Sequence, residues 1–340
     1  MKVVFRADAS VQMGSGHLMR CLTLAEVLQE LGVETKFICG DHDGNLNACV
    51  QGKGVPVTVL LRTSLVDAVT DAEQTILALD GERPDWMVVD HYGLDIEWER
   101  RLKPVVGRLL VIDDHTGRSH DCDVLLDQNY SVEGAQRYAG LVSSTCRMLL
   151  GPSYALLRKE FGELRGHMRR WSSLDNILVF FTAGDDQGET LKAMQGVELF
   201  GKAKQVDVVV GHSNLHNAAI KQKCDELHWG YHCQVDYMPA LIAQADLVVG
   251  AGGSSNWERC ALGVPALVAI LADNQAPIAQ ALDSAGVVRN LGWFHTLQPT
   301  DYADALRELD ARRLTDMSDK AMRIVDAAGA KRVADALLGS

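Results

Sequence analysis

Short apolar runs alternate along the chain with segments of helical periodicity. The runs rich in Val, Ile and Leu are 2–5, 35–39, 57–61, 86–90, 108–113 and 123–127, followed by 176–181, 205–211, 246–253 and 265–270. Near-continuous apolar strands that alternate with helices are typical of a parallel sheet covered on both faces. The alternation therefore predicts an α/β protein whose buried strands lie at these positions.

The segment between the first two runs predicts a helix with one apolar face. Its apolar residues recur at steps of three and four, at Leu18, Leu22, Ala25, Leu28 and Leu31. Gly32 follows them and is expected to end the helix, because glycine is favoured just beyond a helix C-terminus.

The alternation stops near residues 151–175 and then resumes, which predicts two α/β halves. We expect an N-terminal domain at 1–152, a helical linker at 153–174, a C-terminal domain at 175–314 and a C-terminal helix at 315–340. The helical apolar pattern of this last segment is interrupted near Gly329. The arginine cluster of the linker region is expected to form a solvated helix face; it consists of Arg165, Arg169 and Arg170.

Composition excludes several classes of partner. The net charge of −12 disfavours nucleic acid, which needs a basic stripe, but leaves room for a small anionic ligand at one loop. No segment approaches the length of a membrane span or a signal-peptide core, so a cytoplasmic location is expected, with no membrane span. The eight cysteines form no CxxC pair, so we expect reduced packing residues and no metal site, although His228, His232 and Cys233 lie close together.

Four loops are expected to carry the ligand site. In doubly wound sheets, ligands bind beyond the carboxyl ends of the strands, and two facing halves would form a cleft there. The loops at these positions are 8–17, 90–95, 182–188 and 250–258.

The loop 8–17 brings two glycines directly before a histidine. Gly14 and Gly16 allow close approach of the backbone to a ligand, but position 19 is Met19 and no Walker lysine is present. Neither a dinucleotide cofactor nor a P-loop nucleotide is therefore indicated, and we expect no cofactor. His17 begins a helix, where a neutral imidazole is favoured and could serve as a general base. A partly buried histidine bonded to a neighbouring loop fits its position equally well.

The loop 250–258 resembles a diphosphate cradle without a lysine. Small residues and hydroxyls follow a strand from Ala251 to Asn256, and Glu258 lies where it could accept ribose hydroxyls or simply interact with a helix dipole. Asn274 and Gln275 follow the next strand and could contact sugar or phosphate. In the N-terminal half, Asp90, His91 and Tyr92 end a buried strand, and Asp113 and Asp114 end another, where we expect a hydrogen-bonding or capping role for one of the two.

Four ordered motifs resemble a known family. FRADASVQMGSGHLMRCLTLAEVL, VVDHYGLD, GPSYALLRKEF and GAGGSSNWERCALGVP are similar to the nucleotide-sugar hydrolase of pseudaminic-acid biosynthesis, the PseG family. SpsG-type proteins and, more remotely, MurG are its relatives. The resemblance implies a GT-B fold, two Rossmann-like domains with the active site between them. It also implies metal-independent hydrolysis of UDP-2,4-diacetamido-2,4,6-trideoxy-β-L-altrose to UDP and free sugar.

The resemblance also assigns roles to residues. It places the catalytic residues at His17 and Tyr92, the latter as the tyrosine of the cleft. It places the nucleotide loop at 252–258, with Glu258 on the ribose. Together with the loop analysis, the expected substrate- and nucleotide-binding residues are Asp8, Gly14, Ser15, Gly16, Arg20, Asp90, Asp185, Gly252, Gly253, Ser254, Ser255, Asn256, Glu258, Asn274 and Gln275. One loop departs from the family, because Thr182-Ala183-Gly184-Asp185 replaces a Gly-Gly-Ser-Asp-like sequence.

The expected mechanism is a one-step displacement with inversion, in which His17 takes a proton from the attacking water. Two alternatives remain. A GT-B glycosyltransferase would use the same UDP-sugar donor with another acceptor, and a non-catalytic protein would only bind the nucleotide sugar. A UDP-sugar 2-epimerase is also possible on this fold, but its characteristic acids and histidines are not found. We expect a UDP-sugar and UDP as ligands and a monomer or a weak homodimer.

Overall fold

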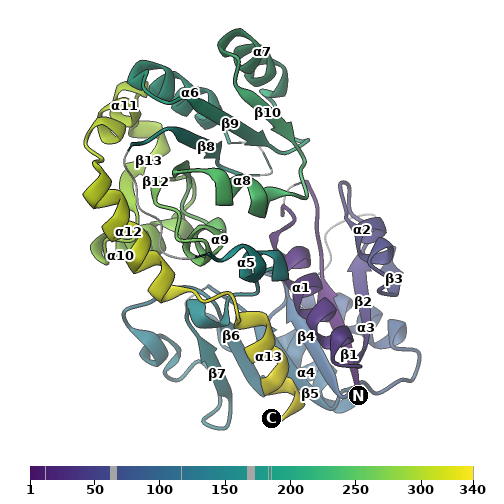
Figure 1. Cartoon of the computed structure of the whole chain (residues 1–340). Coiled ribbons are helices and arrows are strands. Elements are labelled where there is room, and N and C mark those ends of the chain that lie inside the picture. The colour runs from purple at the N-terminus through teal and green to yellow at the C-terminus, as the bar shows by residue number, and fades with distance from the viewer. Residues whose placement is uncertain are drawn as a thin grey trace. The chain divides into compact units, whose positions relative to one another are not determined.

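A computed structural model describes residues 1–11, 13–61, 67–115, 117–166, 173–182, 184 and 186–339. The chain forms two compact units: unit 1 contains residues 1–157 and 328–340, and unit 2 contains residues 158–327 (Figure 1). The segment 315–340, expected as one helix, is thus divided between the two units.

Unit 1 is built on a seven-stranded parallel sheet. Its strands are β1 (Lys2–Ala7), β2 (Glu34–Gly40), β3 (Val57–Leu60), β4 (Trp86–Asp90), β5 (Arg108–Ile112), β6 (Val124–Asp127) and β7 (Arg147–Leu150). They lie in the order β3-β2-β1-β4-β5-β6-β7, with every pairing parallel. The chain order reverses direction between β1 and β4, which makes this the switch point where doubly wound sheets bind ligands.

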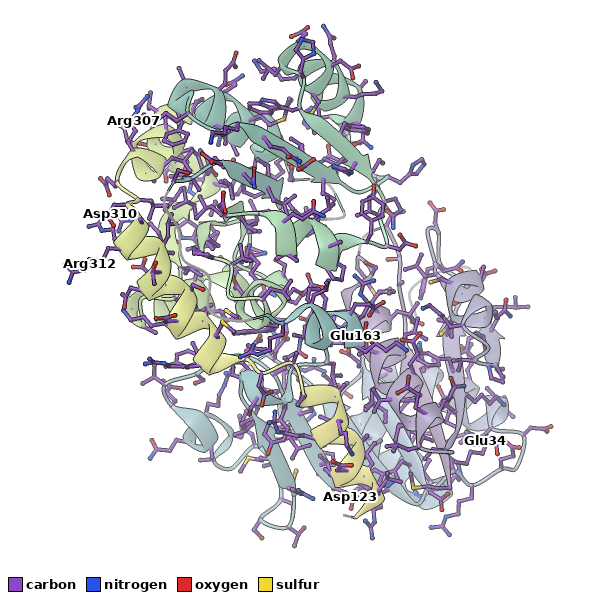
Figure 2. All side chains as sticks on the ribbon, viewed as in Figure 1. Glu34, Asp123, Glu163, Arg307, Asp310 and Arg312 are labelled. Carbon is purple, nitrogen blue, oxygen red and sulfur yellow. The ribbon has the colours of Figure 1, made fainter. Side chains whose placement is uncertain are left out.

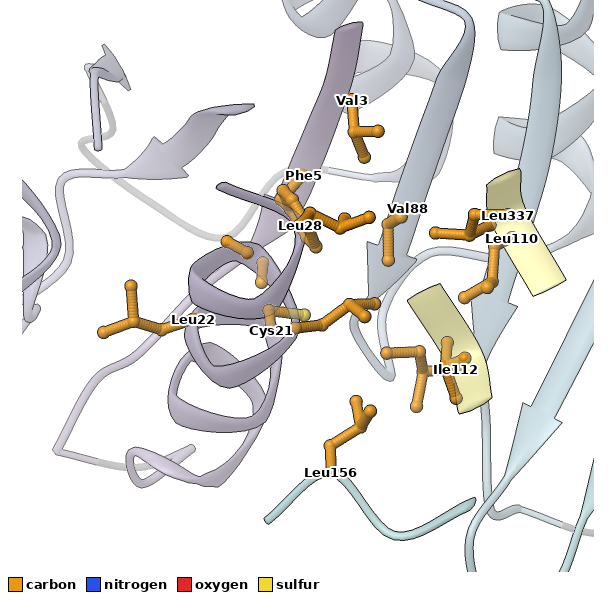
Figure 3. Close-up of a cluster of buried hydrophobic side chains, with 14 of the residues drawn as sticks. Val3, Phe5, Cys21, Leu22, Leu28, Val88, Leu110, Ile112, Leu156 and Leu337 are labelled. Atoms are coloured by element: carbon orange, nitrogen blue, oxygen red, sulfur yellow. The ribbon is translucent and has the colours of Figure 1, made fainter. Parts of the chain in front are cut away.

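Helices cover both faces of this sheet. They are α1 (Gly16–Glu30), α2 (Asn47–Gly52), α3 (Ala68–Ala78), α4 (Ile96–Leu102) and α13 (Gly329–Leu338). Val3 and Phe5 of β1 belong to the core beneath α1 and α13, whereas Val4 belongs to the core on the opposite face. Figure 3 shows Leu28 of α1 beside Phe5 of β1, and Leu337 of α13 beside Leu110 of β5, in one cluster. Burial on both faces explains why these strands are apolar runs rather than alternating sequences.

Unit 2 repeats this plan with six strands. They are β8 (Asn176–Phe180), β9 (Gln205–Val210), β10 (Gly230–Cys233), β11 (Leu247–Ala251), β12 (Ala266–Ile270) and β13 (Arg289–Trp293). The order is β10-β9-β8-β11-β12-β13, again all parallel, so the switch point lies between β8 and β11. Its helices are α5 (Lys159–Leu164), α6 (Glu189–Phe200), α7 (Asn217–Leu227), α8 (Met238–Gln244), α9 (Ser255–Ala261), α10 (Ala276–Ser284), α11 (Pro299–Arg307) and α12 (Ala311–Ile324).

All ten strands expected from the apolar runs are present, and three further strands are not among them. β7, β10 and β13 each lie at the edge of a sheet. An edge strand pairs on one side only, so its side chains are less completely buried and its sequence is less apolar. In GYHC of β10 and RNLGW of β13 no side chain is fully buried, and neither sequence forms an apolar run.

Two local expectations for helices are corrected. Helix α1 buries Leu18, Leu22, Ala25 and Leu28 and ends before Gly32, which has the left-handed φ of +78° that favours glycine. Leu31, however, is the C-cap residue and is 44% exposed, because the helix ends one residue earlier. The tail forms two helices, α12 and α13, rather than one.

Arg165 does not lie on a solvated helix face. Its guanidinium donates to the carbonyl oxygens of Ala261 at 2.7 Å, of Met322 at 2.6 Å, and of Val325. These carbonyls lie at the C-terminal ends of α9 and α12, where helices carry partial negative charge. Arg169 and Arg170 lie outside the described residues.

Many charged side chains lie on the outer surface. Figure 2 labels Glu34, Asp123, Glu163, Arg307, Asp310 and Arg312, and all six are exposed. Six of the eight cysteines are buried, as expected of packing residues, but Cys49 is exposed and Cys233 is half-buried; all eight are free thiols. Across the described residues, no helix is long and apolar enough to cross a membrane.

Candidate active site

The first two candidate loops meet at the switch point of unit 1. The loop 8–17 follows β1 and the loop 90–95 follows β4, and these neighbouring strands pair Ala7 with Asp90. The topology therefore brings together residues that are more than seventy positions apart in sequence.

His17 forms a hydrogen bond with a buried carboxylate. Its Nδ1 lies 2.6 Å from Oδ1 of Asp90, which is fully buried. A carboxylate accepts only, so Nδ1 carries the proton, and in the neutral imidazole the lone pair lies on Nε2. His17 itself is 12% exposed in its side chain. With its proton on Nδ1, a neutral His17 can accept a proton at Nε2, as a general base must.

Arg20, which lies on α1 like His17, also binds Asp90. Its Nε and Nη2 donate to the two carboxylate oxygens at 2.5 and 2.6 Å, a bidentate pair. Burial opposes ionisation of Asp90, but the charge of Arg20 and the hydrogen bonds from Arg20 and His17 hold the pKa of Asp90 well below the usual range. Because Arg20 lies one turn after His17, helix α1 fixes both partners of the carboxylate.

Tyr92 extends this cluster on its exposed side. Its ring lies edge-on to His17 with centroids 4.4 Å apart, and its hydroxyl donates to Oδ1 of Asp114 at 2.8 Å. His115 packs edge-on against the other part of the same ring, at 4.5 Å. Burial and the neighbouring Asp114 raise the pKa of Tyr92 well above its ordinary value. Tyr92 is therefore a neutral phenol at physiological pH, a hydrogen-bonding group rather than a base.

Asp113 and Asp114 both have the hydrogen-bonding role that we expected of one of them. Asp114 lies near Arg20, with 3.6 Å between Oδ2 and Nη1. Asp113 is buried and accepts from His120, whose other nitrogen bonds Glu99. As successive residues after a strand, the two carboxylates serve different partners.

Asp8 lies behind this cluster in a buried ion-pair network. Arg6 donates to both of its oxygens, at 2.6 and 2.8 Å, and also to Asp71. His42 lies 3.1 Å and His91 3.5 Å from its Oδ2. Burial lowers the pKa of His91 to about 4, so this histidine is neutral. The oxygens of Asp8 are already engaged within unit 1, and its role as a ligand residue stays a prediction.

The glycine loop has one position that requires glycine. Gly14 has a φ of +74° and pairs with Ser10 in a short antiparallel bridge. Gly16 begins α1 with ordinary φ, and a Cβ there would meet no described atom within 4 Å. Ser15 is the N-cap residue, and its side chain makes no cap hydrogen bond.

The other two candidate loops meet at the switch point of unit 2. The loop 250–258 follows β11 and the loop 182–188 follows β8, its neighbour in the sheet. Ala183 and Asp185 lie outside the described residues, so the expected role of Asp185 and the effect of the departure from the family loop stay predictions. Asp186 is buried and accepts from the N–H groups of Gly188 and Thr190, where α6 begins.

The glycines of the second loop lie against Gln275. A Cβ on Gly253 would lie 3.7 Å from its Nε2, and one on Gly252 would lie 3.6 Å from its Cβ. Asn256 is buried and donates to the carbonyl of Gly252 at 2.9 Å. Asn274, in contrast, is exposed beyond β12. Unit 2 thus brings four of the predicted nucleotide residues together.

Glu258 and Arg259 follow in α9. Glu258 is half-buried, and burial raises its pKa to about 6, against the opposing charges of Arg158 and Arg259. Ser254 is exposed and is the N-cap residue of α9, and Ser255 begins this helix.

Sequence reasoning did not single out the network around Asp8. Arg6, Asp71 and His42 are absent from the expected residues, and Arg6 was expected to end the first apolar run. The strand instead continues to Ala7 with Arg6 fully buried. A charge inside a parallel strand needs a buried partner, which is the signal that identifies such a network.

Comparison with known proteins identifies curated relatives. The UDP-2,4-diacetamido-2,4,6-trideoxy-beta-L-altropyranose hydrolase of Campylobacter jejuni is 30% identical over 238 residues, which are 70% of this chain and 79% of the relative. The spore coat polysaccharide biosynthesis protein SpsG of Bacillus subtilis is 24% identical over 297 residues, 86% of this chain and 84% of the relative. No family model matches the chain.

Solved structures share the fold. MurG of Acinetobacter baumannii superimposes with a TM-score of 0.71 over 100% of this chain and 99% of its own, at 12% identity. The predicted α/β class with two Rossmann-like domains of GT-B type is thereby confirmed. With the identity and coverage of the Campylobacter relative, the chain belongs to the family of UDP-2,4-diacetamido-2,4,6-trideoxy-β-L-altropyranose hydrolases.

Proposed function

We propose that this protein hydrolyses UDP-2,4-diacetamido-2,4,6-trideoxy-β-L-altrose to UDP and the free sugar, a step of pseudaminic acid biosynthesis. Membership of the hydrolase family supports the substrate. The observation that carries the chemistry is the 2.6 Å bond between His17 Nδ1 and Asp90, because it leaves Nε2 as the proton acceptor.

In this proposal His17 removes a proton from water as the water attacks the anomeric carbon. The C–O bond to UDP breaks on the opposite side, so the configuration inverts. The developing imidazolium is stabilised by Asp90, which Arg20 keeps ionised. General-base assistance of this kind contributes about 10²- to 10⁴-fold in rate.

Unit 2 holds the nucleotide in this proposal. UDP is a stable leaving group once N–H donors receive its developing charge, and the segment Gly252–Asn256 would supply them. Glu258 would accept the ribose hydroxyls, and Gln275 and Asn274 would contact sugar or phosphate. Tyr92 would contribute a neutral phenol beside His17 in unit 1.

The test is UDP release from the diacetamido-trideoxy-altrose donor without any added acceptor. Wild type should release UDP, with unchanged rate in EDTA, and His17→Asn should lose about 10²- to 10⁴-fold in kcat while it still binds UDP. His228→Asn is the matched control, because His228 has a φ of +56° that asparagine tolerates.

Two results would contradict the proposal. Normal turnover by His17→Asn would remove the histidine from the mechanism. Wild type that binds UDP and releases none without an acceptor would instead favour a glycosyltransferase, the alternative compatible with the same fold.

A further inference from the structure

Arg259 is a buried arginine at the switch point of unit 2. Its side chain is 2% exposed, and Nη2 donates to the carbonyl of Ala251 at 3.1 Å and to Oδ1 of Asn256. A Cβ built on Gly250 would lie 3.2 Å from Nη1. The guanidinium therefore lies against the C-terminal end of β11, where the segment Gly252–Ser255 begins.

Among the described residues, the guanidinium of Arg259 forms no ion pair, and the charge that acts on it from a distance is that of its neighbour Glu258. Its Nε and Nη1 are buried without a hydrogen bond, and no carboxylate of the described residues lies within ion-pair distance. Burial lowers its pKa to about 10. An unpaired buried cation is costly, so proteins normally supply a counter-charge.

Two other arginines of this chain show that normal arrangement. Arg6 is fully buried between the carboxylates of Asp8 and Asp71. Arg20 forms a bidentate pair with Asp90. Arg259 alone of these three lacks a carboxylate, and it is the one that lies at the start of the predicted nucleotide loop.

Arg259 also orients that loop. It binds the carbonyl of Ala251, and its partner Asn256 binds the carbonyl of Gly252, so both carbonyls are turned into the protein. Among the described residues, no acceptor is bound by the N–H groups of Gly253, Ser254 and Ser255. The loop thus combines unused donors with a positive charge close to its start.

We propose that Arg259 is a positioning residue that selects the diphosphate of the ligand, whose negative charge compensates this buried guanidinium. The proposal rests on the proposed function, since it takes the nucleotide to be a nucleoside diphosphate bound in unit 2. It predicts that Arg259 contributes to the preference for UDP over uridine and adds little to uridine binding itself.

The experiment measures binding of UDP, UMP and uridine by calorimetry to the full chain. Arg259→Met removes the charge at similar volume, Arg259→Lys keeps it, and Arg312→Met is a control on an exposed arginine. In Arg259→Met we expect UDP affinity to fall about 30-fold with uridine affinity within about twofold, and UMP between them. Arg259→Lys should keep most of the UDP preference at pH 7.

A second measurement does not depend on the folding of the methionine variant. A buried lysine loses its proton more readily than arginine, so UDP affinity of Arg259→Lys should fall between pH 7 and 9.5 more steeply than that of wild type. Uridine affinity should show no such difference.

Several outcomes would overturn the proposal. Equal loss of UDP and uridine affinity in Arg259→Met would show that the arginine maintains the structure of the site and does not select the diphosphate. No loss of either affinity would show that it does not contribute to binding. A lysine variant with the pH response of wild type would likewise contradict it. If wild type releases UDP from the donor and Arg259→Met keeps the preference for UDP over uridine, this inference alone fails. If wild type binds no UDP, the proposed function fails as well.

Discussion

The carboxylate of Asp90 controls which nitrogen of His17 carries the proton. Both of its oxygens bind Arg20, and one of them also binds Nδ1 of His17. In Asp90→Asn the side chain keeps its shape but can present an N–H to the imidazole, which favours the wrong tautomer. We expect kcat for UDP release to fall at least about 100-fold, with UDP affinity unchanged.

Asp114→Asn is the matched control for this prediction. It makes the same carboxylate-to-amide change on the neighbouring strand end and removes the negative charge of the group that accepts from Tyr92, but it does not touch His17. Its effect on kcat should be less than about tenfold. Equal losses in the two variants, or normal turnover in Asp90→Asn, would contradict the assigned role of Asp90.

At the residue scale, sequence reasoning found the participants of this cluster but not their bonds. His17, Arg20, Asp90 and Tyr92 were all among the expected residues because they lie at strand ends or in a recognised motif. From the sequence, the helix dipole is the electrostatic influence expected on His17. The structure adds the carboxylate of Asp90, which lies seventy-three residues away in sequence. Such pairings depend on strand order, which apolar runs do not specify.

Arg165 joins the ends of two helices of unit 2. Its three carbonyl acceptors belong to Ala261, the last residue of α9, to Met322 in the last turn of α12, and to Val325 directly after α12. Arg165→Ala leaves these carbonyls without a charged donor and should destabilise unit 2 by about 3 kcal/mol. Arg312→Ala, on the exposed face of α12, should change stability by less than about 0.5 kcal/mol. Calorimetric unfolding of the two variants compares them, and similar transition temperatures would refute the bridging role.

His120 joins α4 to the end of β5 through two buried carboxylates. Burial opposes its charge, but the bonds to Asp113 and Glu99 raise its pKa to about 9, above the ordinary value of 6.5. Because the folded pKa is raised, the stabilisation is fully present below about pH 6.5 and is lost as pH rises through about 9. Its size is about 3 kcal/mol for a shift of this extent.

Hydrogen exchange of the β5 and β6 amides measures this contribution locally. Protection in wild type should decrease between pH 7 and 9.5 after correction for intrinsic exchange. In His120→Gln, the β5 and β6 amides should be less protected than in wild type at pH 7, and their protection should not decrease between pH 7 and 9.5. Parallel pH profiles for the two proteins would show that another group titrates.

At the element scale, burial decides what sequence patterns can predict. Central strands such as β4 and β11 are apolar on both faces and are visible as runs. The edge strand β7 contains the exposed Arg147, and β13 begins with the exposed Arg289. Their strand character comes from pairing with a neighbour, which is a tertiary interaction and leaves a weak trace in the local sequence.

At the scale of the whole molecule, the two sheets follow one topological rule. Each reverses its strand order between its first and fourth strands, so two predicted loops come together in each unit. The rule made the four loops predictable from strand ends alone. It did not predict which chain segments complete each unit, because that depends on how the tail packs.

The tail completes unit 1 from the far end of the sequence. Val333, Ala334 and Leu337 of α13 are buried in the core that this helix and α1 form with the sheet. The carbonyl of Leu337 accepts from Trp86 Nε1 at 3.0 Å. A fragment of residues 1–157 would expose this apolar surface, whereas 158–327 contains all elements of unit 2. Fragment 158–327 should therefore fold alone and bind UDP without releasing it from the donor.

Fragment 1–157 should be unfolded or aggregated, and residues 328–340 attached through a short linker should restore it. Circular dichroism and thermal unfolding measure whether each fragment folds: 158–327, 1–157, and 1–157 with residues 328–340 attached. Since the helix supplies both apolar contacts and the acceptor for Trp86, adding the tail with Leu337→Asp should fail to rescue the fragment. A stable 1–157 fragment would contradict this prediction. It would show that unit 1 folds without α13, so that the packing of α13 on its core is not required for folding.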